Sequence, residues 1–319
     1  MASFFSTTKE QIVEFYSELP LWGKSMVVVG AALVTYIPYR YYVTRPRKTP
    51  IKQDFAEDVV YLYQFPRVKC IPSFSPYCLK LETWLRMANI KYENVDCGWF
   101  TRSCEGTLPF LEYNGREYPD SSLAIRDMSA ICLKEPLESH LTEQQVAAAR
   151  AFEKLAECSL FPTVAYMRFA EHAGEFVEQI PDKYFGTITV FIRWFMKKTL
   201  TAQVLKAMKV VGIGKHSRDE VVNIAADDLR AISVYMGQKP YLTGFKPGKA
   251  DAALFGVLAQ IVYSPFELPQ KTLITNELTN LKEYCDRIKS TFFVVEQFWP
   301  DWDECTTNFV LNSDQKKKL

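Results

Sequence analysis

Hydrophobic and polar positions alternate in short blocks over residues 59–125. The apolar run Val59–Tyr63 is typical of a buried strand, and Lys91–Val95 has the pattern of a second strand. Between them, the apolar positions from Leu81 to Ala88 recur at i, i+3, i+4 and i+7, which predicts an amphipathic helix. The helix should begin near Pro76, because a residue in the first turn needs no N–H donor.

A hairpin and another helix follow in the sequence. Asn114-Gly115 separates two short apolar runs, and this dipeptide is the strongest local signal for a two-residue hairpin turn. Asp120 or Ser121 then opens a helix, since a side-chain oxygen at the first position accepts a backbone N–H. The succession of elements predicts an α/β domain over residues 58–135.

Residues 136–305 have helical periodicity. A long helix is expected over 142–172, bent near Pro162 because proline removes a backbone donor. The apolar stretch 184–211 is interrupted by basic residues, so we expect a core helical hairpin there rather than membrane contact. A capping box opens a further helix at about 218–237. The second domain is therefore predicted to be all-α.

An uncharged stretch, residues 25–39, lies between Lys24 and Arg40. If both charges snorkel, the apolar zone reaches about 20–25 residues, which predicts one N-terminal membrane helix over residues 19–43. A cleaved signal peptide and a buried helix of the folded domain are the alternatives. Positive charge is heavier on the C-terminal flank, which predicts an uncleaved signal anchor with the folded domain in the cytosol.

The anchor hypothesis implies a single-pass membrane protein with an N-terminal segment over 1–18, a polar linker over 44–57 and a tail over 306–319. The tail ends in three lysines and a leucine, 316–319, which fits either a dilysine retrieval signal or a solvated basic tail. The mitochondrial outer membrane, the endoplasmic reticulum and the lysosome all remain open as its location.

Charge and cysteine usage exclude some functions. The net charge of +1 gives no broad field for nucleic acid. Eight cysteines occur without a CxxC, and the three histidines lie far apart, so no metal site is expected from the spacing. Cys97 and Cys104 are the nearest-spaced pair and form only a weak metal pair. Thiols in a reducing compartment are the simplest interpretation.

Three motifs resemble the thioredoxin-like half of a glutathione transferase: Ser75-Pro76-Tyr77-Cys78, Thr107-Leu108-Pro109 and Asp120-Ser121, in this order. The resemblance implies glutathione as ligand or co-substrate. It implies that Pro109 is a cis-proline whose neighbouring backbone pairs with the cysteinyl part of glutathione. It also implies that Asp120 and Ser121 hold the γ-glutamyl group, although a plain helix cap is the alternative interpretation of this pair.

Ser75 is the candidate catalytic residue. It stands where a glutaredoxin or a cysteine-type transferase has its nucleophilic cysteine, so dithiol chemistry is disfavoured and Cys78 keeps only the resolving position. The Ser75 hydroxyl could donate to the glutathione thiolate and lower its pKa, with help from the helix dipole. Ser73 and Tyr63 are alternative hydroxyls, and Ser75 could be only a helix cap.

Residues 241–256 resemble the C-domain signature of the transferases, in which a buried aspartate caps the central helix. That residue is Asp251, a structural residue, and its usual Ser or Thr partner is replaced by Gly248. Together with the run 75–96, the loop 212–217 and the apolar N-terminal segment, these features are similar to the failed-axon-connections and cadmium-responsive family, which is related to metaxins. The similarity covers about 58–305.

The expected fold is thus a thioredoxin-like α/β domain plus an all-α domain like the C-terminal half of a glutathione transferase, preceded by one membrane helix. Three functions follow from the resemblance: glutathione binding with conjugation, a non-catalytic metaxin-like interaction protein, and a cadmium or oxidative stress role. Glutathione binding with transferase-like activity is favoured. The expected partners are membrane lipid through residues 19–43, glutathione, and a second copy or a membrane protein.

Overall fold

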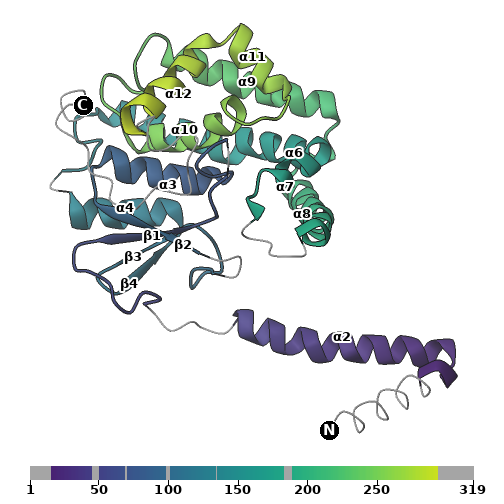
Figure 1. Ribbon diagram of the computed structural model, residues 1–319. Helices are drawn as coiled ribbons and strands as arrows, with labels where there is room; N and C mark the ends of the chain where they lie inside the picture. Colours follow the sequence, from purple (N-terminus) through teal and green to yellow (C-terminus); the bar gives the residue numbers. More distant parts are fainter. Residues whose placement is uncertain are drawn as a thin grey trace. The chain divides into compact units, whose positions relative to one another are not determined.

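The computed structural model describes residues 16–44, 50–68, 70–97, 101–133, 135–182 and 189–293. The chain divides into two compact units, Met1–Lys48 and Thr49–Leu319 (Figure 1). The tail 306–319 with its lysines, and the start of the N-terminal segment, lie outside the described residues.

The first unit contributes helix α2 (Leu21–Thr44), so a helix does form at the apolar stretch. The prediction that it crosses a membrane is wrong, because none of the helices in the described ranges combines the length and the apolar character that a membrane span needs. The uncharged stretch between Lys24 and Arg40 has about 15 residues and is about 22 Å long, short of a hydrocarbon core of about 30 Å. This finding corrects three expectations from the sequence: the membrane anchor at 19–43, the single-pass localisation with a cytosolic domain, and membrane lipid as the partner of this segment.

The second unit begins with a four-stranded sheet, which confirms the predicted α/β domain. Its strands are β1 (Val60–Gln64), β2 (Tyr92–Asp96), β3 (Phe110–Tyr113) and β4 (Arg116–Pro119), in the order β2-β1-β3-β4. β2 runs parallel to β1, whereas β3 runs antiparallel to both β1 and β4. Asn114 and Gly115 join β3 to β4 with φ values of 47° and 76°, as a two-residue hairpin turn requires.

Helices α3 (Pro76–Met87) and α4 (Ser121–Cys132) pack on this sheet and against each other. Figure 1 shows them between the sheet and the helical half of the unit. Ser75 caps α3, with Pro76 in the first turn, and Asp120 caps α4. Both helix starts that the sequence predicted are confirmed, so the loops before α3 and α4 are fixed by their caps.

The predicted long helix of the second half is present as α5 (Glu143–Leu155), the π-helical turn η1 (Ala156–Leu160) and α6 (Phe161–Glu171). Thr142 and Gln145 form its capping box. The π-helical turn lies directly before Pro162, where the ring leaves no N–H for the regular helical bond. The helix is therefore irregular next to the proline that the sequence singled out.

The remaining helices are α7 (Ala173–Glu178), α8 (Thr189–Val211), the short 3-10 turn η4 (Ile213–Lys215), α9 (Arg218–Met236), α10 (Lys249–Val262), α11 (Pro269–Asn276) and α12 (Thr279–Phe292). The hairpin predicted over 184–211 is wrong, because residues 189–211 form one continuous helix. α8 packs on α6 and α7, and its Trp194 and Phe195 are 52% and 54% exposed. Apolar content alone did not show which face of this helix was covered.

The central helix α10 joins the two halves. Its residues from Ala250 to Ile261 are buried, and it packs along α3. A Cβ at Gly256 would lie 2.5 Å from the carbonyl oxygen of Pro76, so only glycine allows this approach. The start of α3, where Ser75 lies, is thereby held against the helical half.

Candidate functional site

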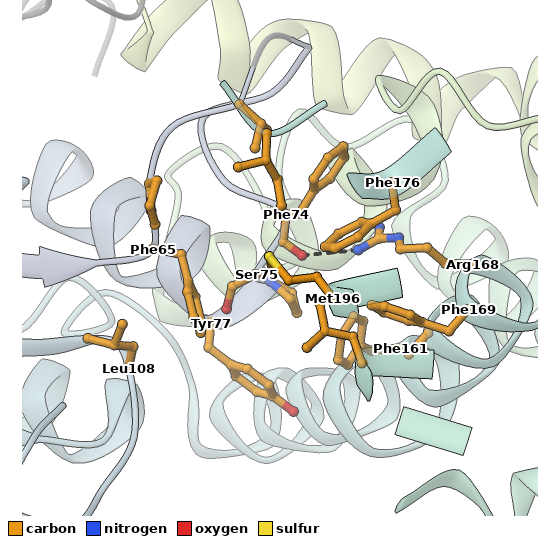
Figure 2. Close-up of a pocket in the computed structure, with 16 residues that line it drawn as sticks. Phe65, Phe74, Ser75, Tyr77, Leu108, Phe161, Arg168, Phe169, Phe176 and Met196 are labelled. Carbon is orange, nitrogen blue, oxygen red and sulfur yellow. Dashed lines mark hydrogen bonds between the residues drawn. The ribbon is translucent and has the colours of Figure 1, made fainter. Parts of the chain in front are cut away.

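A cavity of about 340 Å³ lies between the start of α3 and the helices α6, α7 and α8. In Figure 2 residues of the sheet half, among them Phe65, Tyr77 and Leu108, face residues of α6 across this space. Ser75, Tyr77 and Arg168 bring the only polar side chains to the described lining. The other lining residues are Phe65, Pro66, Val68, Phe74, Pro76, Leu108, Phe161, Ala165, Phe169, Phe176, Ile180, Met196 and Leu200. The cavity therefore suits an apolar ligand with a few polar contacts at its edge.

Ser75 reaches this cavity from the N-terminus of α3. Its φ and ψ of −92° and 117° place the hydroxyl to accept the N–H of Cys78 at 3.4 Å. A hydroxyl that accepts still has its own proton to donate. Capping α3 and donating to an anion in the cavity are therefore compatible roles, and the helix dipole favours negative charge at this point.

The alternative hydroxyls lie away from the cavity. Tyr63 is buried and donates to Glu112 Oε2 at 2.7 Å, and Ser73 is buried and accepts the N–H of Ser75 at 3.2 Å. The Cys78 thiol is fully buried, and this burial raises its pKa. Cys78 is thus a packing residue here, and Ser75 is the hydroxyl among the three candidates that faces the cavity.

Pro109 stands directly before β3, and the Leu108–Pro109 peptide bond is cis, as the resemblance implied. The Leu108 side chain lines the cavity. The backbone beside the cis bond therefore lies at the edge of the same space that Ser75 faces.

Asp120 and Ser121 lie at the N-terminus of α4 and outside the cavity lining. Asp120 has a φ of 61°, and its Oδ1 accepts the N–H groups of Ser122 and Leu123 at 2.8 and 3.0 Å. These two bonds are those of a helix cap, which is the alternative interpretation of the Asp120-Ser121 pair. Oδ2 has no hydrogen-bond partner among the described residues, and Ser121 is 4% exposed. Glutathione contact by this pair stays a prediction.

Sequence reasoning missed two polar residues of the cavity, Tyr77 and Arg168. Burial, with a smaller contribution from the charge of Glu157, raises the pKa of Tyr77 to about 12. Arg168 on α6 is 2% exposed and donates to the Phe74 carbonyl and to Gln260 Oε1, both at 3.1 Å. Tyr77 lay inside a motif already singled out, whereas no local motif marked Arg168.

Asp251 is buried in the first turn of α10, away from the cavity lining. Its carboxylate accepts the N–H groups of Leu242 and Gly248, both at 2.8 Å, and the hydroxyl of Tyr284 at 3.0 Å. Gly248 supplies no side-chain cap. Burial raises the pKa of Asp251 to about 6 despite these donors.

The described cysteines form no disulfide and no metal cluster. Within the described ranges, no three His, Cys, Asp or Glu side chains are grouped so that they could hold an ion. The Cys97 thiol lies 2.7 Å from the carbonyl of Gln64, and Cys104 is exposed.

Two family models match the chain. The N-terminal domain model of glutathione S-transferases matches residues 76–174, and the C-terminal domain model matches residues 225–288. Residues 175–224 lie between the two matches and include α8. Four residues of the cavity lining come from this intervening segment: Phe176, Ile180, Met196 and Leu200.

Several curated proteins are similar to this chain. Failed axon connections of Drosophila melanogaster is 35% identical over 82% of this chain, and the chain spans 63% of that protein. The isoprene-epoxide–glutathione S-transferase of a Rhodococcus species is 27% identical over 70% of this chain and 94% of its own length. Human metaxin-2 is 24% identical over 67% of this chain and 81% of its own length.

Solved structures show the same fold at low identity. A glutathione S-transferase of Ceriporiopsis subvermispora in complex with glutathione has a TM-score of 0.53 at 15% identity, covering 74% of this chain and 98% of its own. A glutathione transferase of Phanerochaete chrysosporium has a TM-score of 0.52 at 14% identity, covering 75% and 99%. These comparisons establish the arrangement of elements alone.

Proposed function

This chain belongs to the glutathione S-transferase-like family related to metaxins, and from that premise we propose that it binds glutathione beside Ser75 and directs the thiol into the apolar cavity. The observation that carries the proposal is the meeting of three features at one edge of the cavity. These are the Ser75 hydroxyl, the N-terminus of α3 and the Leu108 side chain beside the cis bond.

In this proposal the backbone next to Pro109 pairs with the cysteinyl part of glutathione. The γ-glutamyl carboxylate binds at the N-terminus of α4, because N–H groups and the helix dipole favour an anion there. The second oxygen of Asp120 accepts a hydrogen bond from the γ-glutamyl ammonium group. The Ser121 hydroxyl donates to the γ-glutamyl carboxylate.

The chemistry follows from the cavity. A hydrogen bond from the Ser75 hydroxyl to the sulfur stabilises the thiolate over the thiol, so the thiol releases its proton to solvent more readily. The thiolate then attacks an electrophilic carbon of an apolar molecule in the cavity. A carbon–sulfur bond forms, and the leaving group departs with the electron pair of the bond that breaks.

Calorimetry of the full chain with glutathione tests the binding. We expect heat from the parent chain and at least about ten-fold weaker binding for Asp120→Ala, because a charged hydrogen-bond partner is lost. Ser290→Ala is the matched control, since Ser290 is exposed on α12 and bonds only to its own helix. Ser75→Ala should still bind glutathione but lose conjugation of a chloronitrobenzene. An absence of heat with the parent chain would rule out the proposal.

A non-catalytic interaction protein is the second candidate function. It is supported by the similarity to metaxins and by the exposed apolar residues of α8: Trp194, Phe195, Val210 and Val211. In that case a protein partner should bind the parent chain and not a Trp194→Ser, Phe195→Ser variant. Unchanged partner binding by that variant would argue against α8 as the contact surface. A second copy of the chain is a further partner that the transferase-like fold suggests.

A further inference from the structure

Arg168 places a buried positive charge in the wall of the apolar cavity. Among the described residues its hydrogen-bond acceptors are neutral, namely the Phe74 carbonyl and the Gln260 side chain. Its Nε is buried and has no partner there. In Figure 2 the Arg168 side chain points toward Phe74, and a dashed line joins it to the Phe74 carbonyl.

The other buried cations in the part of the chain that the structure describes are neutralised. Lys80 pairs with Glu153 and Glu157, and Arg86 pairs with Glu82. Arg168 instead lies near aromatic faces, 5.1 Å from the ring centroid of Phe74, 5.6 Å from that of Phe266 and 5.9 Å from that of Phe176.

Aromatic rings compensate a buried guanidinium only in part. Burial lowers the pKa of Arg168 to about 10, so the group is still charged at neutral pH. A counter-ion would therefore be stabilised strongly at this place.

We propose that the cavity binds an apolar monoanion whose carboxylate pairs with Arg168 while its hydrocarbon part fills the space between α6 and α8. Apart from Ser75, Tyr77 and Arg168, the described lining residues are aromatic or aliphatic, so the rest of the ligand is apolar. This inference needs only the cavity and Arg168, and it does not depend on glutathione binding.

The test is calorimetry on the full chain with two probes of matched length, decanoate and the uncharged decanol. We expect decanoate to bind at least about ten-fold more tightly than decanol, because its carboxylate forms a charged hydrogen bond with Arg168 in an apolar site. Arg168→Gln should weaken the binding of decanoate by the same factor and leave the binding of decanol little changed. Arg218→Gln, which removes an exposed arginine paired with Glu171, is the matched control and should alter neither.

Leu200→Trp narrows the cavity from α8 and leaves Arg168 in place. It should weaken the binding of both probes, which would show that both bind in this cavity. Equal binding of decanoate and decanol by the parent chain would overturn the proposal, as would unchanged decanoate binding by Arg168→Gln. If Arg168→Gln does not fold, the comparison of the two probes on the parent chain and on Leu200→Trp decides. If glutathione displaced decanoate competitively, Arg168 would be the partner of a glutathione carboxylate instead. That result would also overturn the proposal.

Discussion

Lys80 is the residue whose removal should weaken the contact between the two halves of the second unit most directly. Its ammonium lies 2.9 Å from Glu153 Oε1, 2.6 Å from Glu157 Oε1 and 2.7 Å from the Ser122 hydroxyl. Lys80 is 1% exposed, and the two carboxylates are buried. Burial acts to raise the pKa of Glu153, but the charge and hydrogen bond of Lys80, together with smaller contributions from Lys249 and Arg150, lower it. The three side chains therefore form a coupled ion cluster between α3 and the long helix.

Replacing Lys80 by methionine leaves two carboxylates buried without their shared cation. Removing one partner of a buried pair costs about 3–5 kcal/mol. Glu153 keeps Arg150 at 3.1 Å and Glu157 keeps Lys154 at 2.6 Å, both partly exposed, so we expect the lower value of about 3 kcal/mol. At about 2–4 °C per kcal/mol for a domain of this size, Tm should fall by about 6–12 °C. Urea and thermal unfolding followed by circular dichroism measure both quantities.

The control is the triple variant Lys80→Met, Glu153→Gln, Glu157→Gln. Because it removes the charges together, it should recover most of the lost stability. The reasoning would be refuted by a single variant within about 1 kcal/mol of the parent chain. It would also be refuted by a triple variant no more stable than the single one.

Two further predictions concern α10. Gly256→Ala should destabilise the protein by about 1–3 kcal/mol, because the new Cβ meets the Pro76 carbonyl. Gly30→Ala in α2 is the control and should not destabilise the protein, because its Cβ has open space. Equal effects of the two variants in unfolding experiments would contradict the packing argument. The Asp251 pKa is about 6 in the folded protein against 3.8 for a free side chain, so the stability from its protonated form is complete below about pH 3.8 and lost as the pH rises through about 6. Asp251→Asn should remove this pH dependence from Tm, and parallel pH profiles for the two proteins would show that Asp251 does not cause it.

Local signals in the sequence were sufficient for much of the fold. The Asn114-Gly115 turn and the caps at Ser75 and Thr142 lie within a few residues of the elements they begin or join. The cis bond before Pro109 could be inferred only through resemblance to a family, since no local pattern of side chains specifies it. Features of this kind depend on neighbours in sequence or on inherited motifs.

The cavity could not be predicted, because it depends on which distant residues pack together. Arg168 looks like an ordinary helical residue until Phe74 and Gln260 are brought to it from other elements. The face of α8 that meets α6 was equally hidden, because apolar and basic residues are interspersed along the whole helix. The same limitation explains α2, where apolar composition predicted a membrane span and a helix of insufficient apolar length is found.

The most direct test of the proposed site is a pH titration of the thiol of bound glutathione, followed by the ultraviolet absorption of the thiolate. A free thiol of this type ionises at about pH 8.5. The account predicts a clearly lower pKa for glutathione bound to the parent chain and a return toward the free value with Ser75→Ala, because the donated hydrogen bond is lost. A thiol that titrates at the free value in the saturated parent chain, or one that is unaffected by Ser75→Ala, would contradict it.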